Sequence, residues 1–135
     1  MANGTIAFDT LSTSGQISGT AKSLDTDYVV NGSAKAWVNF NGTGTVAARD
    51  SLNISSLNDD GAGLHDTNFT NSFGNTNYSC VSQCSYIDAA SNNVSMNMFE
   101  TVGLSTSSAP YISQIGGGGN EDRSHHFSVN HGDLA

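Results

Sequence analysis

Residues 34–63, AKAWVNFNGTGTVAARDSLNISSLNDDGAG, alternate short runs of strand-forming residues with glycine-containing turns, and this pattern decides the fold. In AKAWVNF, Val38 and Phe40 fall on one face of an extended chain and Trp37 on the other, because side chains alternate along a strand. We therefore expect Val38 and Phe40 in a core. Upstream, DYVVNGSAKAWVNF predicts a β-hairpin with Asn31-Gly32 at its turn, since both residues tolerate a positive φ.

The chain then returns through TVAARDSLNISSL, where Leu52 and Ile54 alternate with polar residues and are predicted to be buried. Before this core stretch, residues 1–33 are small, polar and weakly patterned, which predicts an N-terminal arm or attachment segment. Residues 34–135 are expected to form the β domain.

Further strands are predicted downstream. The segments are LHDTNF (64–69), YSCVSQCSYID (78–88), NNVSMNMFE (92–100) and HFSVNH (126–131). In the last of them Phe127 and Val129 share a face that we expect to be buried, and the four glycines at 116–119 predict a loop before it. Turns recur about every eight to twelve residues and no helical period is sustained, so the sequence predicts an all-β domain, a β-sandwich or jelly-roll-like fold.

Composition supports the same class of fold and excludes some partners. Ser, Thr, Asn and Gly make up 62 of the 135 residues, and these residues disfavour helix interiors. The formal net charge is −8 with only 4 Lys and Arg residues, which opposes nucleic-acid binding because phosphate contacts need basic side chains. We also expect no membrane insertion and synthesis in a cytoplasm, since MANGTIAFDT is no secretory signal and no apolar run reaches the length of a membrane helix.

The two cysteines, Cys80 and Cys84, are predicted to be free thiols. On an extended strand they share a face but lie roughly 13 Å apart, whereas a disulfide needs Cα atoms within about 7 Å. A CxxxC metal half-site is the alternative, although the sequence offers no convincing second pair of ligands.

Three of the four histidines cluster near the C-terminus in HHFSVNH, and their spacing fits no established zinc pattern. His125 and His126 would face opposite sides of a strand, so one chain could not bring both to one ion. In a trimer, one histidine from each chain could meet on the axis, which makes His125, His126 and His131 candidate metal ligands. A solvated surface position is the alternative, and we expect no cofactor.

No catalytic motif stands out. The sequence holds no GxSxG elbow, no phosphate-binding glycine loop followed by Lys, and no HExxH. Asp59, Asp60 and Asp66 stand in turn-like contexts, whereas catalytic acids usually lie in a cleft. We predict that the chain is not an enzyme. A glycan depolymerase using paired carboxylates stays open as an alternative, because such pairs need only meet in space.

The run GSAKAWVNFNGTGTVAARDSLNISSLNDDGAG, the segment from Asn68-Phe69 to Asn77-Tyr78 and the terminal GDLA resemble a family of tail-fibre and related virion proteins of marine bacteriophages, including cyanophages. AKAWVNFNGTGTV (34–46) is the most specific part, and GTIAFDTLSTSGQISGTAKSLDTDYVVNGSAKAW is also similar to the segment that precedes this core in the family. The resemblance implies a β-rich, homotrimeric virion component at the distal end of a fibre, where the host surface is recognised. It transfers no catalytic residue.

Together these observations predict a non-enzymatic virion structural protein, made in the host cytoplasm, with other tail or capsid proteins and a host-surface glycan or protein as partners. A tail fibre or fibre tip is the first expectation, and a capsid or tail decoration protein is the alternative. Trp37 is expected at a subunit interface, because it faces away from the core residues of its strand and aromatics are enriched in interfaces. A place in the second face of a sandwich strand is the competing interpretation.

Overall fold

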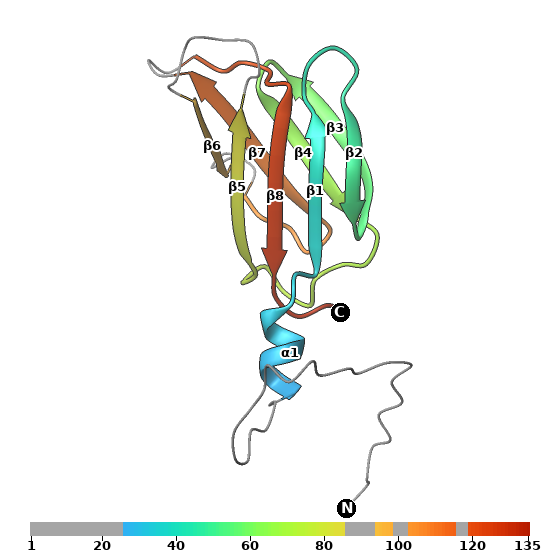
Figure 1. Ribbon diagram of the computed structural model, residues 1–135. Helices are drawn as coiled ribbons and strands as arrows, with labels where there is room; N and C mark the ends of the chain where they lie inside the picture. Colours follow the sequence, from blue (N-terminus) through green and yellow to red (C-terminus); the bar gives the residue numbers. More distant parts are fainter. Residues whose placement is uncertain (1–25, 86–93, 99–102, 116–118) are drawn as a thin grey trace, which may run out of the picture.

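The computed structural model describes residues 26–85, 94–98, 103–115 and 119–135, and these ranges form eight strands and one short helix. The helix is α1 (Thr26–Gly32), and the strands are β1 (Ala36–Asn41), β2 (Ala47–Leu52), β3 (Ile54–Gly61), β4 (Leu64–Phe69), β5 (Ser79–Ser85), β6 (Val94–Met98), β7 (Ser108–Ile115) and β8 (His125–His131). Sheet A has the order β2-β1-β8-β5 and sheet B the order β3-β4-β7-β6, and every pairing is antiparallel. The all-β expectation is confirmed. Sheet A lies in front of sheet B in Figure 1.

Both sheets contribute to one hydrophobic core. On β1 the predicted alternation is confirmed, since Ala36, Val38 and Phe40 are at most 2% exposed while the residues between them are half-buried. On β4 the buried positions are His65, Thr67 and Phe69, which alternate with half-buried residues. The cluster of buried apolar residues comprises Ala36, Val38, Phe40, Phe69, Phe73, Tyr78, Cys84, Ala109 and Tyr111, which come from strands of both sheets and from the β4–β5 loop.

An aromatic cluster ties the β4–β5 loop to the rest of the domain. Phe73 lies 5.0 Å from Phe69 and 4.2 Å from Tyr78 between ring centroids. The Tyr78 hydroxyl donates to the carbonyl oxygens of Ser105 and Ser108, at 3.1 and 3.0 Å. The C-terminal residues join the same loop through backbone hydrogen bonds from Gly74 to Asp133 and from Ala135 to Ser72.

The predicted hairpin at Asn31-Gly32 is wrong, because residues 26–32 form α1 and only residues after 35 begin a strand. Asn31-Gly32 ends a helix here, a position where glycine is also favoured. Side chains just beyond the helix complete its last turn. The Ser33 hydroxyl and the Lys35 ammonium both donate to the carbonyl of Val30. These bonds satisfy a carbonyl that helix geometry leaves without an internal partner.

The single strand predicted through TVAARDSLNISSL is two strands in two different sheets. The chain crosses from β2 to β3 at Asn53, which has a φ of 59°. Asn tolerates this left-handed conformation, and its side chain is held in place because Oδ1 accepts from the backbone N–H of Asn71 at 2.7 Å. The crossing changes the facing of its neighbours, so Leu52 is 47% exposed rather than buried, while Ile54 packs partly buried against the core.

The strand predicted near the C-terminus is confirmed as β8, but its facing is the reverse of the expectation. Phe127 and Val129 are 39% and 36% exposed, and the polar residues His126, Ser128 and Asn130 point into the domain. The strand expected over 92–100 is confirmed for β6. Three predictions fall at least partly outside the described residues: the arm over residues 1–33, of which 1–25 are not described, the side chains of β6, and most of the glycine loop.

Candidate functional site

A pair of buried histidines lies between the two sheets. His126 on β8 stacks on Phe40 at 4.5 Å between ring centroids, and His65 on β4 lies 4.9 Å from His126. Both histidines are at most 1% exposed. Burial, followed by the charge of His65, lowers the pKa of His126 to about 3, so this imidazole is neutral at physiological pH. The pair is therefore part of the packed interior.

Gly42 makes room for this ring. A Cβ at position 42 would lie 2.6 Å from Nε2 of His126, which is closer than real contacts allow. The Gly42 N–H donates to the carbonyl of Arg123 at 2.9 Å and thereby fixes the segment that leads into β8. The Arg123 side chain is 2% exposed and forms an ion pair with Glu121 at 2.9 Å.

A carboxylate closes the other side of the histidine pair. Asp122 Oδ1 lies 4.0 Å from Nε2 of His65 and accepts from the Gly63 N–H at 2.6 Å. Gly63 has a φ of 68°, and a Cβ there would meet the Ser113 carbonyl at 2.5 Å. The turn, the 121–123 segment and the two histidines thus form one interlocked polar region.

The three candidate metal ligands are not brought together. His126 points between the sheets, whereas His125 and His131 lie on the opposite face of β8 and at its two ends. His125 and His131 are six positions apart, a span of roughly 20 Å on a strand. Within the described ranges, no group of three His, Cys, Asp or Glu side chains has the proximity to hold a metal ion.

Cys80 and Cys84 are not joined in a disulfide, as predicted. Cys84 is buried and Cys80 is partly buried with its Sγ 3.5 Å from the Tyr111 hydroxyl. Burial raises the pKa of both thiols, and a thiol held in its protonated form is a poor nucleophile.

The acidic residues expected in turns lie in strands instead. Asp59 and Asp60 belong to β3 and Asp66 to β4. Desolvation, followed by the charge of Asp60, raises the pKa of Asp66. These carboxylates line neither of the two hollows described below.

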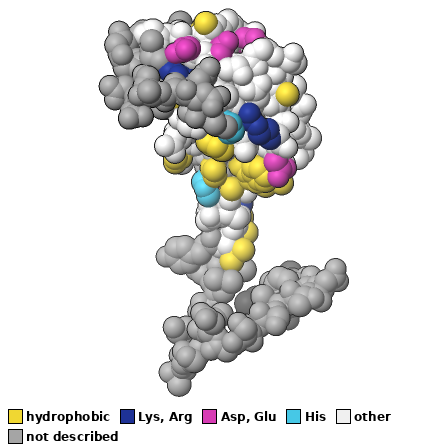
Figure 2. All heavy atoms as spheres, turned by 45° about the horizontal axis from the view of Figure 1, so that its top comes forward, with side chains coloured by type: hydrophobic (Ala, Val, Ile, Leu, Met, Phe, Trp, Pro, Cys, Tyr) yellow, Lys and Arg dark blue, Asp and Glu magenta, His cyan; other side chains and the backbone are white. Residues whose placement is uncertain are grey.

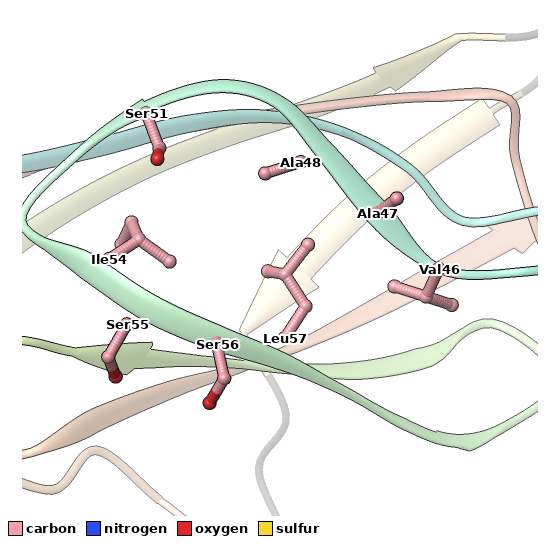
Figure 3. Close-up of a pocket in the computed structure, with 8 residues that line it drawn as sticks. All are labelled: Val46, Ala47, Ala48, Ser51, Ile54, Ser55, Ser56 and Leu57. Carbon is pink, nitrogen blue, oxygen red and sulfur yellow. The ribbon is translucent and has the colours of Figure 1, made fainter.

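The surface formed by the described residues includes two hollows. The first has a volume of about 160 Å³ and opens between the edge strands β2 and β3. Figure 3 shows Ala48, Ile54 and Leu57 pointing into the space between these strands. Ser55 and Ser56 point away from it. The second, of about 280 Å³, lies beside α1. Its lining residues are Asn31, Asn75, Asn77, Tyr78, Gly132 and Asp133. Neither hollow holds a nucleophile paired with a base.

Trp37 lies on the face of β1 that points away from the core, as the alternation predicted. On this face Leu52 and Val129 lie directly opposite Trp37, and Val81 lies opposite Val129; Leu52 and Val129, predicted to be buried, are exposed. On β8 the outward positions carry Phe127 and Val129 while the inward positions are polar, so the sequence gives a signal for this face on that strand. The signal is weak on β1 and β5, which contribute Trp37 and Val81 among polar outward residues.

Comparison with known proteins gives no identification: no family model, no curated protein and no solved structure matches the chain. In the part of the chain that the structure describes, α1 is the only helix, and it is too short to cross a membrane.

Proposed function

We propose that the chain is a non-enzymatic structural protein of a bacteriophage virion, a tail-fibre or fibre-tip component that takes part in attachment to the host surface. The two sheets would form a β-sandwich of the jelly-roll-like type, and the protein would act as a homotrimer. Its partners are other virion proteins and a glycan or protein of the host surface. It is made in the host cytoplasm and resides in the virion.

One observation carries this proposal: an acidic, polar chain presents a row of exposed apolar side chains on the outer face of sheet A. Leu52, Val81, Phe127 and Val129 are between 36% and 68% exposed there. Contiguous exposed apolar side chains on a polar protein mark a surface that another molecule covers. A component of a larger assembly fits this pattern better than an enzyme that works alone, and the resemblance of residues 34–46 to phage fibre proteins points to the kind of assembly.

Two tight turns support the same proposal. The turn at Asn53 joins sheet A to sheet B, and the turn at residues 62–63 joins two neighbouring strands of sheet B, while longer loops connect the other strands. A rigid scaffold with surface loops is the usual way to present a binding surface. Residues 1–33 would join the domain to the rest of the particle.

The test is to locate the protein in the particle. Purified phage is incubated with gold-labelled antibodies raised against the full chain and viewed by electron microscopy. Label at the distal ends of the tail supports the proposal. Label on the capsid or along the tail supports the decoration protein instead, and particles without label overturn both virion assignments.

A companion assay addresses the enzyme alternative. The purified chain is incubated with host-surface polysaccharide, and the chain length of the polysaccharide is followed by size-exclusion chromatography. The proposal predicts no change in length. Shortening that is lost in an Asp60→Asn, Asp66→Asn double variant would overturn the non-enzymatic assignment.

A further inference from the structure

We propose that the outer face of sheet A, together with α1, is the surface through which copies of this chain associate, with two further copies as the occupants. The number three rests on the proposed function as a fibre component. The location of the contact rests on the observations that follow.

A single row of apolar side chains crosses all four strands of sheet A. Leu52 on β2 is opposite Trp37 on β1, Trp37 is opposite Val129 on β8, and Val129 is opposite Val81 on β5. Side chains on directly opposed positions lie about 5 Å apart on the same face. The row therefore forms a continuous apolar band, with Phe127 two residues along β8 from Val129.

The band runs perpendicular to the strands, and this direction favours a particular arrangement of copies. If copies are related by a rotation axis parallel to the strands, all their bands lie at one level along the axis. Every apolar band then meets the bands of its neighbours, and Trp37 and Val129, on the two middle strands, lie at the centre of the contact. Central aromatic residues are the usual anchors of protein interfaces.

The distribution of charge identifies a second copy as the partner. The strands of sheet A carry one acidic and one basic residue, Asp50 and Arg49, so they are neutral overall. The strands of sheet B carry three acidic residues, Asp59, Asp60 and Asp66, and no basic residue. Copies of a chain with a net charge of −8 repel one another, and a neutral face is the one on which they can approach.

The helix α1 extends the apolar surface beyond the sheet. Figure 1 shows α1 projecting from the end of the domain, and Figure 2 shows apolar side chains over the lower part of the domain and continuing along this helix. Val29 and Val30 are 46% and 54% exposed. A helix of seven residues is not stable in water without packing, so α1 needs a partner surface.

The size of the face requires both parts. Four strands about 4.8 Å apart and six residues of about 3.3 Å each give a face of about 19 by 20 Å, or about 400 Å² in plan. A stable contact buries about 800 Å² on each partner. The sheet face alone falls short of this value, so the helices must join the contact. The hydrophobic gain from covering such surface is about 25 cal/mol per Å².

The experiment measures the molar mass of the full chain by light scattering, for the wild type and for variants with a charge on the proposed face. Val81→Asp and Val129→Asp place a carboxylate in the band, and Val30→Asp places one on α1. Ser56→Asp is the matched control, because Ser56 is an exposed residue on β3 of sheet B. Far-UV circular dichroism checks that each variant folds, and Val81, at 68% exposure, is a position that folding does not need.

The wild type is expected at three times the 14.0 kDa of one chain, with a threefold fall in mass for the band variants and no change for Ser56→Asp. A monomeric wild type overturns the inference, and a dimer overturns its threefold arrangement. Unchanged mass in folded Val81→Asp and Val129→Asp, or equal dissociation of Ser56→Asp, overturns the assignment to this face.

Trp37 provides a second measurement, because it is the only tryptophan in the chain. Association would shield its indole, so its fluorescence is expected to shift to longer wavelength and to become more accessible to acrylamide when the wild type is diluted. An emission that does not change across the dissociation seen by light scattering would place the contact elsewhere. Failure of these tests leaves the particle labelling experiment unaffected, so the inference and the proposed function can fail separately.

Discussion

Acid should destabilise this protein through His126. The folded chain holds this imidazole neutral with a pKa of about 3, whereas the unfolded chain has the ordinary value of 6.5. As the pH falls below 6.5, the unfolded state binds a proton that the folded state does not. The folded state therefore loses stability between about pH 6.5 and about pH 3. From these two pKa values the loss is about 2 kcal/mol at pH 5 and about 3 kcal/mol at pH 4.

The groups around the ring support this direction. His65, Arg123 and Arg49 all disfavour a positive charge on His126, and a hydrogen bond with the Arg123 backbone, which favours the charge, offsets them only in part. Asp66 acts in the opposite sense, because its raised pKa makes the folded state bind a proton more readily than the unfolded state. Its contribution is common to the wild type and to any variant at position 126, so it cancels in their comparison.

The perturbation is His126→Leu, which has similar volume and does not titrate. Urea unfolding, followed by far-UV circular dichroism at about pH 7 and about pH 5, gives the unfolding free energy of each protein. Protein concentration is held constant, because association would change the apparent stability. The wild type is expected to lose about 2 kcal/mol more than His126→Leu between the two pH values. His131→Gln, a change at a half-buried histidine on the outer face, should behave as the wild type does. Equal losses in the wild type and His126→Leu would refute the reasoning.

Three further changes test other parts of the structure. In urea unfolding, Gly42→Ala should reduce the unfolding free energy by about 1–3 kcal/mol, because the new Cβ would lie 2.6 Å from His126. Gly74→Ala is the control and should have little effect, because a Cβ there would lie 3.7 Å from its nearest atom. Asn53→Ala should lower the unfolding free energy by about 1–3 kcal/mol, because alanine disfavours the positive φ and the hydrogen bonds to the β4–β5 loop are lost. Asn53→Gly should lower it less, because glycine accepts that φ. Equal losses for the two variants would show that the backbone conformation is unimportant. Cys80 should react with a thiol reagent at least about tenfold more slowly in the folded chain than in urea, because burial raises its pKa, and equal rates would contradict the buried environment.

The sequence predicted the fold class and much of the strand pattern. The alternation in AKAWVNF and LHDTNF holds in the structure because each of these strands has one face against the core. The error at Asn31-Gly32 has a local cause. Asn-Gly suits a hairpin turn, but here it ends a helix whose Val30 carbonyl accepts hydrogen bonds from Ser33 and Lys35, contacts that the dipeptide itself does not signal.

The candidate site was harder to predict because it depends on contacts between distant segments. The burial of His126 requires Phe40 as a stacking partner and Gly42 as the residue that leaves space for the ring. None of these contacts has a signature in the spacing of the histidines. A rule that directs apolar residues inward therefore assigns Phe127 and Val129 to the wrong face, although it assigns Val38 and Phe40 correctly.

The reversed facing of β8 links the interior of the domain to its assembly. Apolar side chains that face water and polar side chains that face a core both cost free energy in an isolated domain. The first cost disappears if copies cover the outer face of sheet A, where Val129 and Phe127 would then lie in a second core. The second cost is moderated where His126 stacks on Phe40 and stays uncharged. On this account β8 is a central strand shared by two cores, one between the sheets and one between copies, so a change on either of its faces affects folding and association together.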